Sequence, residues 1–267
     1  MWWDTWEMWG RGRFRKKRKS NQKVMTSKRK LGCYQSDSKY FITAEPVELN
    51  GLLQRPKCVE NVYRRSIQVD GHEKVTDFGI LNEPFKVCWI QNFIQDEQYL
   101  DDLINFIENT VYELRNTDMF TYHQIEDEIF MSNPLVQRLA TSLVQNVIPF
   151  LSKVVGKKLN KEKVTISASK YTYTNHLLCH DDMSGDRRIA FIIYLNKKWD
   201  KSWGGTLDLY RSDYLLEPTT NIVPEFNRFL FFEVSRFSFH QVAEIINKNA
   251  VRYTINGWFH KPLDEVN

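Results

Sequence analysis

Two histidines and one aspartate in the C-terminal part of the sequence could together bind one metal ion. His180 and Asp182 are two positions apart, and side chains at i and i+2 of an extended backbone point to the same side. His240 begins a later predicted strand and could supply a third ligand. Two histidines and one carboxylate that leave further coordination positions open are typical of non-haem Fe(II) oxygenases.

Each of these residues also has a simpler interpretation. A His-x-Asp sequence is common by chance, and an isolated histidine on a strand is more often a hydrogen-bonded core residue than a metal ligand. Asp181 would point to the opposite side of the strand from Asp182, so we do not expect it to be a ligand. Metal binding is therefore indicated by the three residues together and not by any one of them.

A cation and a hydroxyl lie close together on the last predicted strand. Alternation along that strand puts Arg252 and Thr254 on one face. Arginine offers a planar fork of donors and threonine adds a further hydrogen bond, so the pair suits a buried carboxylate. For an isolated arginine, the alternative is an edge-strand side chain with its charged head in water.

A different metal site would use His176 and His180. At i and i+4 on a helix, the two rings would share one face and could bind zinc. The glutamate that directly follows the first histidine of a zinc-peptidase motif is missing, however. The preceding residues 171–174 also favour a strand over a helix.

The residues that could do chemistry lie among short runs rich in Val, Ile, Thr, Tyr and Phe. Polar turns separate these runs, which resemble strands in composition and length. Six short strands at such intervals predict a jelly roll or a sandwich and not βαβ units. The predicted strands cover residues 164–174, 189–195, 206–210, 229–234, 239–246 and 251–259.

The part of the chain before Lys163 predicts one strand and two helices. Residues 85–93 alternate as a strand does, and residues 96–107 place apolar side chains at helical spacing. A second helix begins at the capping residue before Pro134, and Pro149 should kink it or end it. We therefore predict an α+β fold that is mainly β, in which N-terminal helices support a double-stranded β-helix (jelly roll).

Charge divides the chain into parts. The formal net charge of the chain is +4. A basic tract at residues 11–30 carries eleven Lys or Arg, and residues 1–10 carry two acidic residues, so the net charge of residues 31–267 is −5. The basic tract is a solvated tail, a nuclear-localisation signal or an RNA contact. We predict a basic flexible extension at residues 1–40, a partly ordered lead-in at 41–84, a helical support region at 85–163 and the jelly-roll core at 164–262.

Composition excludes several classes of protein. With 42% hydrophobic residues, 11 Gly and 8 Pro among 267 residues, the chain is neither collagen-like nor mostly disordered. The four cysteines form no C-x-x-C pair, which favours a reducing compartment over a disulfide framework. No apolar run approaches the ~20 residues that cross a bilayer, so we expect no membrane partner.

Six segments resemble the 2-oxoglutarate- and Fe(II)-dependent oxygenases, and specifically the ribosomal prolyl 3-hydroxylases with their prolyl 4-hydroxylase-like dioxygenase domain. The similarity is strong from residue 164 to 261 and weaker back to 85. The segments that carry it are Leu178–Asp182, Arg187–Leu195, Trp203–Tyr210, Phe231–Ser235, Phe239–Val242 and Ile255–His260.

The resemblance implies a role for each site residue. His180, Asp182 and His240 would be the iron ligands, and Arg252, beside Thr254, would hold the distal carboxylate of 2-oxoglutarate. Tyr194, which by itself predicts only a buried strand residue, stands where this family has a tyrosine that hydrogen-bonds the cosubstrate. Fe(II), 2-oxoglutarate and ascorbate as reductant are the cofactors implied.

The resemblance also implies a substrate. In that family the target is a proline of a small-subunit ribosomal protein, in the nucleus and cytoplasm, and the basic tract would contact RNA or an import receptor. The same chemistry on another protein or on a nucleic-acid base is an alternative, as is a non-catalytic jelly-roll binding protein. Relatives commonly continue into a second jelly-roll-like domain, whereas this sequence ends at Asn267.

Overall fold

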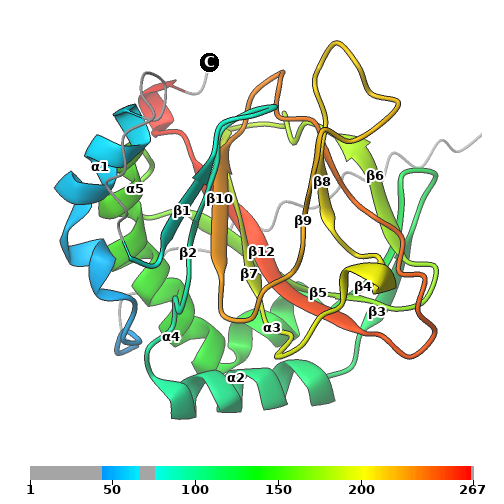
Figure 1. Cartoon of the computed structure of the whole chain (residues 1–267). Helices are drawn as coiled ribbons and strands as arrows, with labels where there is room; N and C mark the ends of the chain where they lie inside the picture. The colour runs from blue at the N-terminus through cyan, green and yellow to red at the C-terminus, as the bar shows by residue number, and fades with distance from the viewer. Residues whose placement is uncertain (1–43, 66–75, 266–267) are drawn as a thin grey trace, which may run out of the picture. The chain divides into compact units, whose positions relative to one another are not determined.

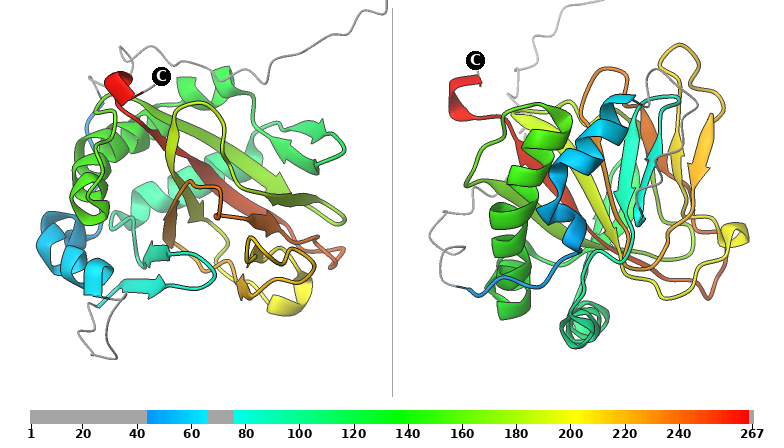
Figure 2. Two further views of the ribbon diagram at one scale, coloured as in Figure 1. Left: turned by 90° about the horizontal axis from the view of Figure 1, so that it is seen from above. Right: turned by 60° about the vertical axis from the view of Figure 1, so that its left-hand side comes forward.

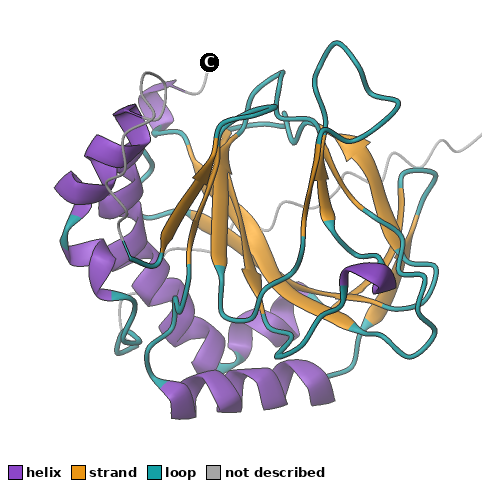
Figure 3. Cartoon of the chain, in the orientation of Figure 1, coloured by secondary structure: helices purple, strands orange, loops and turns teal. Residues whose placement is uncertain are grey.

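The computed structural model describes residues 44–65 and 76–265 as a curled antiparallel sheet with helices against one of its faces (Figures 1 and 3). The predicted extension at residues 1–40 lies outside the described residues. The strands are β1 (Phe78–Leu81), β2 (Val87–Ile90), β3 (Glu113–Asn116), β4 (Phe120–Gln124), β5 (Val164–Tyr171), β6 (His176–His180), β7 (Arg187–Tyr194), β8 (Leu207–Leu209), β9 (Thr220–Ile222), β10 (Phe229–Glu233), β11 (His240–Val242) and β12 (Arg252–His260).

The last eight strands pair in a nested order. β8 pairs with β9, β7 with β10, β6 with β11 and β5 with β12, all antiparallel. This is the connectivity of a long hairpin rolled up into a jelly roll, and the predicted jelly roll is confirmed. β12 also pairs with β7, which makes it a central strand with partners on both edges.

The alternating side chains of the central strands face two different cores. Along β7, Ile189, Phe191 and Ile193 pack against the helices, whereas Ala190 and Tyr194 belong to a second cluster inside the roll. β10 alternates in the same way. Because even-numbered positions of β7 and β12 face the interior of the roll, the polar residues of β12 point into an enclosed space.

The helices cover the outer face of the sheet, and α1 packs against α5 (Figure 2). None of the described helices is long and apolar enough to cross a bilayer. The helices and helical turns are η2 (Gly51–Gln54), α1 (Pro56–Arg65), α2 (Glu97–Asn109), α3 (Asp127–Ser132), α4 (Pro134–Ser142), η3 (Leu143–Val147), α5 (Ile148–Val155), η4 (Lys201–Trp203) and η5 (Leu263–Glu265).

The two predicted helices are present, with one difference. α2 begins after Asp96, whose side chain accepts a hydrogen bond from the Tyr99 N–H, as the helical spacing predicts. The helical path that begins at Pro134 continues past Pro149 to Val155. A π-helical turn, η3, directly precedes α5 and places Pro149 in the first turn of a new helix, where its missing N–H costs little.

Several strands differ from the prediction. The strand predicted for residues 164–174 ends at Tyr171, and Thr174 has a positive φ of 69° in the turn before β6. The strand predicted for 239–246 spans only β11, and none of the predicted strands covers β1, β3, β4, β6 or β9, although residues 180–182 were expected to be extended. These five strands are short, with three to five residues each, and runs of this length carry too little alternation to distinguish a strand from a loop.

Gly204 marks the turn that feeds β8. Its φ of 77° and ψ of −153° lie in a region that is essentially restricted to glycine, and an added Cβ would lie 1.9 Å from the Glu244 carbonyl oxygen. The turn therefore excludes every side chain at this position.

We expect Gly204→Ala to lower the free energy of unfolding by roughly 3 kcal/mol or more, because strain and a backbone clash add. Gly185→Ala is the matched control, since its φ is also positive, at 59°, but nothing lies within 4 Å of the added Cβ. That variant should lose only about 1–2 kcal/mol. Urea unfolding of both proteins checks the difference, and equal losses would contradict the clash.

Candidate active site

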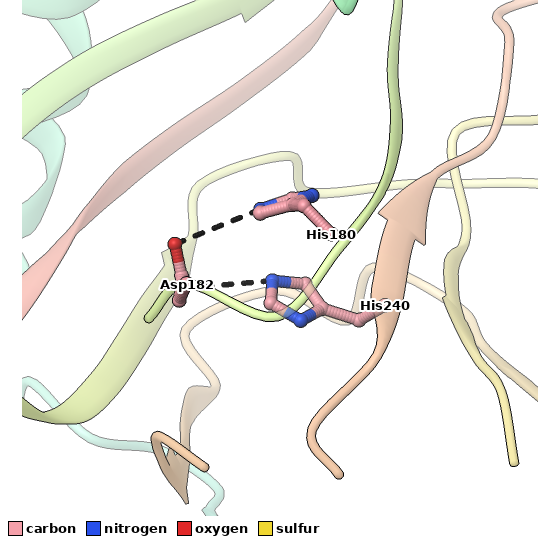
Figure 4. A group of neighbouring side chains, drawn as sticks. All are labelled: His180, Asp182 and His240. Atoms are coloured by element: carbon pink, nitrogen blue, oxygen red, sulfur yellow. Dashed lines mark ion pairs between the residues drawn. The ribbon is translucent and has the colours of Figure 1, made fainter. Parts of the chain in front are cut away.

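Strand pairing brings the two predicted histidine ligands together. His180 is the last residue of β6 and His240 the first of β11, and the two are direct partners in the antiparallel register. Asp182 faces both: its Oδ1 lies 3.6 Å from His180 Nε2 and its Oδ2 lies 3.6 Å from His240 Nε2 (Figure 4). One ligand atom from each residue lies within 4.8 Å of the others, so the three could hold one ion.

Asp182 reaches the site by a different route from the one predicted. The strand ends at His180, and Asp182 has a left-handed φ of 64°, so strand alternation does not align the two side chains. A turn directs the carboxylate back toward the histidines, and aspartate is one of the residues that tolerates this conformation. Asp181 lies outside the cluster, and its carboxylate accepts a hydrogen bond from the Met183 N–H.

Both histidines are oriented by backbone carbonyls. The Nδ1 of His180 lies 2.8 Å from the Leu178 oxygen, and the Nδ1 of His240 lies 2.7 Å from the Ser238 oxygen. A carbonyl can only accept, so each Nδ1 carries the proton and each Nε2 presents its lone pair toward Asp182. This is the tautomer that a metal bound at Nε2 requires.

Burial keeps His240 neutral. The pKa of His240 is lowered to about 4 by burial and by the nearby His180, while Asp182 opposes the shift. The imidazole is therefore unprotonated at neutral pH and available to a cation without first losing a proton.

The zinc pair considered above does not form. His176 lies at the start of β6, with its Nδ1 3.0 Å from the Thr174 carbonyl oxygen, and it is outside the metal-ligand cluster. Because the segment is a strand and not a helix, residues i and i+4 are too far apart to share an ion.

Arg252 and Thr254 face the same interior space as the three metal-ligand candidates. A cavity of about 100 Å³ is lined by His180, Asp182 and His240 and also by Arg252 and Thr254. Although Arg252 is only 1% exposed, its Nε and Nη2 have no hydrogen-bond partner among the described residues. A buried guanidinium without a counter-ion is unfavourable, so the cavity suits an anionic ligand.

Tyr194 completes the polar side of this interior. It is the register partner of Thr254, and its ring centroid lies 5.3 Å from the Arg252 guanidinium carbon. Its hydroxyl is buried without a hydrogen-bond partner among the described residues. Burial raises the pKa of Tyr194 despite the opposing charge of Arg252, so the hydroxyl stays protonated and can donate to a carboxylate.

Three residues near the site were missed by sequence analysis. Tyr171 stacks on Tyr122 at 5.2 Å and lies 5.2 Å from the Arg252 guanidinium carbon, and Trp258 lines the cavity from β12. Trp258 could have been found, because it shares the even-numbered face of the strand with Arg252 and Thr254.

Comparison with known proteins agrees with this geometry. Residues 166–260 match the 2OG-Fe(II) oxygenase superfamily. The chain therefore contains a 2OG-Fe(II) oxygenase domain. All six site residues, from His180 to Thr254, lie inside the matched segment of that oxygenase domain.

Relatives of the oxygenase domain include three named prolyl 3-hydroxylases. The chain is 38% identical over 183 residues to prolyl 3-hydroxylase OGFOD1 of Mus musculus, covering 67% of this chain and 33% of that protein. It is 34% identical over 216 residues to the Xenopus laevis protein of that name (80% and 42%). It is 32% identical over 241 residues to prolyl 3-hydroxylase sudestada1 of Drosophila melanogaster, covering 84% of this chain and 44% of that protein. The chain spans less than half the length of these relatives.

Solved structures support the fold. A prolyl-4-hydroxylase of Pseudomonas putida superimposes with a TM-score of 0.52 at 14% identity, covering 76% of this chain and 98% of that one. A prolyl hydroxylase from Trichoplax adhaerens, solved with a hypoxia inducible factor peptide, gives 0.51 at 20% identity, with 80% and 94% covered. At these identities the likeness concerns the fold of the oxygenase domain alone.

We expect Arg252→Met to raise the dissociation constant for 2-oxoglutarate at least about a hundredfold, since a charge-assisted contact is lost. Without ligand, the variant should melt at or above the wild-type temperature, because an unpaired buried charge is removed. Calorimetric titration and thermal melting check both outcomes.

Arg228→Met is the control for stability. Arg228 is also buried, but its Nε bonds Gln91 at 2.9 Å and its Nη2 pairs with Glu225. That variant should melt lower than wild type and still bind 2-oxoglutarate. Normal 2-oxoglutarate affinity in Arg252→Met would place the cosubstrate carboxylate elsewhere.

Proposed function

We propose that this oxygenase domain is a prolyl hydroxylase that uses Fe(II) and 2-oxoglutarate to hydroxylate a prolyl residue, at C3, of a small-subunit ribosomal protein. The observation that carries the proposal is the cavity that joins the His180, Asp182 and His240 cluster to the buried Arg252, whose Nε and Nη2 have no hydrogen-bond partner among the described residues. A dicarboxylate such as 2-oxoglutarate can contact a metal ion with one end and a guanidinium with the other.

The residues present fit the metal. His180 and His240 would bind Fe(II) through Nε2 and Asp182 through a carboxylate oxygen, a ligand set that suits iron and leaves open positions. When bound, Fe(II) and 2-oxoglutarate would supply the activation of dioxygen, of which one oxygen atom enters the substrate and the other enters the succinate that forms as 2-oxoglutarate loses CO2.

The protein's own contribution is binding, orientation and exclusion of water. Arg252 would pair with the distal carboxylate of the cosubstrate, and the hydroxyls of Thr254 and Tyr194 would add hydrogen bonds. Leu207 and Phe232 form apolar walls of the same cavity, which keeps bulk water out and strengthens these polar contacts.

A rim of exposed apolar side chains next to the site supports a polypeptide substrate. Met183 follows Asp182 directly and is 60% exposed, and Phe237, on the loop before β11, is 49% exposed. Leu178, two residues before His180, is 42% exposed, and its N–H donates to the carbonyl of the exposed Met119. Exposed apolar side chains that adjoin site residues in the sequence in this way favour contact with a protein.

The finer parts of the proposal rest on the resemblance and on charge. The net charge of −5 over residues 31–267 suits a basic protein substrate such as a ribosomal protein. Ascorbate as reductant, a nuclear and cytoplasmic location, and contact of the basic tract at 11–30 with RNA or an import receptor belong to the same proposal.

The decisive experiment incubates the purified chain with Fe(II), 2-oxoglutarate, ascorbate and proline-containing peptides of small-subunit ribosomal proteins. Succinate is followed together with peptide mass. We expect succinate and a gain of one oxygen on a proline, with fragmentation and NMR placing the hydroxyl at C3. Succinate without a modified peptide would contradict the ribosomal substrate, and no succinate from folded, iron-loaded protein would contradict the enzyme.

We expect Asp182→Ala to abolish both succinate formation and peptide oxidation, because two histidines alone do not hold Fe(II) in an open site. Asp181→Ala is the matched control and should keep most of the wild-type activity. Circular dichroism verifies that both variants are folded. Full activity in Asp182→Ala would overturn the ligand assignment.

The rim generates a separate prediction. Phe237→Ser and Met183→Ser should raise KM for the peptide about tenfold each, as expected for loss of a buried apolar contact, while KM for 2-oxoglutarate stays unchanged. Ile129→Ser, an exposed apolar position on α3, serves as the control. Unchanged peptide KM in both rim variants would place the substrate elsewhere.

A further inference from the structure

Arg187 makes a contact that neither sequence analysis nor the proposed mechanism uses. It is the first residue of β7, and its Nη1 lies 3.3 Å from Oδ1 of Asp182. The other oxygen of that carboxylate, Oδ2, is the one 3.6 Å from His240 Nε2. Oδ1 lies equally close, at 3.6 Å, to His180 Nε2, so each oxygen faces one histidine and only Oδ1 has a guanidinium beside it.

Trp258 holds the Arg187 side chain in place. The guanidinium carbon lies 3.5 Å from the Trp258 ring centroid, which is the stacking distance of a cation over an aromatic face. Trp258 lies on β12, the strand that carries Arg252 and pairs with β7. The tryptophan thus fixes the plane of the guanidinium before any ligand binds.

Asp182 depends on this contact more than an ordinary buried carboxylate would. Its side chain is only 7% exposed, and within residues 44–65 and 76–265 Arg187 is the only residue recorded as donating a hydrogen bond to it. Its backbone is in a left-handed turn and not in the sheet, so strand pairing does not orient it. Without Arg187, the carboxylate could rotate about its side-chain bonds.

We propose that Arg187, stacked on Trp258, positions the Asp182 carboxylate so that Oδ1 is held by the guanidinium and Oδ2 alone is left to bind the metal. This inference rests on the proposed function. A carboxylate with both oxygens free can bind a cation through both, whereas one that accepts a strong hydrogen bond on Oδ1 is held as a one-oxygen ligand. The coordination positions of the metal ion that stay open in this way are the ones that 2-oxoglutarate and dioxygen need.

Arg188 provides the matched control for Arg187. It is the next residue of the same strand and has a similar exposure, with its side chain 17% exposed against 19% for Arg187. A register shift between β7 and β12 interrupts the alternation at this end of the strand, and Arg188 pairs with Glu265 instead of Asp182. If an arginine at this end of β7 served only to stabilise the fold, substitution of Arg187 and substitution of Arg188 would have the same effect.

The test compares Arg187→Gln and Arg187→Lys with Arg188→Gln, using Mn(II) as the metal probe and its EPR signal as the readout. In Arg187→Gln we expect Mn(II) to bind about tenfold more weakly, the usual effect of losing a residue that orients a ligand. KM for 2-oxoglutarate should stay within about twofold of wild type, because Arg252 is intact. Succinate released per hydroxylated peptide should rise. Arg188→Gln should match wild type in all three measurements.

Arg187→Lys separates charge from geometry. Lysine keeps the cation but lacks the planar fork, so we expect an intermediate loss of Mn(II) affinity and still more succinate per product than in wild type. If Arg187→Gln does not fold, this variant decides the question. If the Arg187 variants matched Arg188→Gln in Mn(II) affinity and in succinate released per hydroxylated peptide, the positioning role would be overturned and the proposed function would still stand. Wild-type protein that binds no Mn(II) would overturn both.

Discussion

The nested antiparallel pairing of β5 to β12 is the constraint on which the rest of this structure depends. Because β6 pairs with β11, His180 and His240 become register partners although they lie far apart in the sequence. Because β12 pairs with both β5 and β7, Thr254 lies directly beside Tyr194 and two residues from Arg252. The metal-ligand candidates and the anion-binding candidates therefore come together through backbone hydrogen bonding, before any side-chain contact is considered.

Alternation along these strands then separates two environments. One face of β7 and β10 packs against the helices in a large apolar core, and burial of that core supplies most of the stabilisation. The other face lines a small interior in which polar groups such as Arg252, Thr254 and His240 are buried. The outer core thereby stabilises an arrangement that would be unfavourable by itself, such as a buried guanidinium at Arg252 whose Nε and Nη2 have no hydrogen-bond partner within residues 44–65 and 76–265.

This interior suits a cation at one end and an anion at the other. His240 is kept neutral and its Nε2 lone pair faces Asp182, while Tyr194 remains protonated next to a cation. A cation beside His240 and Asp182, and an anion beside Tyr194 and Arg252, would supply the interactions that these buried groups lack. The match of residues 166–260 to the oxygenase superfamily and the similarity to prolyl 3-hydroxylases agree with this chemistry.

The sequence by itself determined the local elements with strong periodicity and the chemistry of the site residues. α2 follows from apolar spacing and a capping aspartate, and the long strands follow from alternation, because these signals depend on neighbouring residues only. The types of His180, Asp182, His240, Arg252 and Thr254 indicated a metal and a carboxylate ligand for the same local reason. Tyr194 was assigned a role beyond the core only through family resemblance.

Only the tertiary structure decided how these residues meet. The left-handed turn at Asp182, the π-helical turn before Pro149 and the short strand β4, which pairs with β5 and β6, depend on contacts with distant segments. The stack of Arg187 on Trp258 and its contact with Asp182 join residues from β7, β12 and the turn after β6. Such contacts have no periodicity within one segment, because their free energy is gained only when the whole sheet closes.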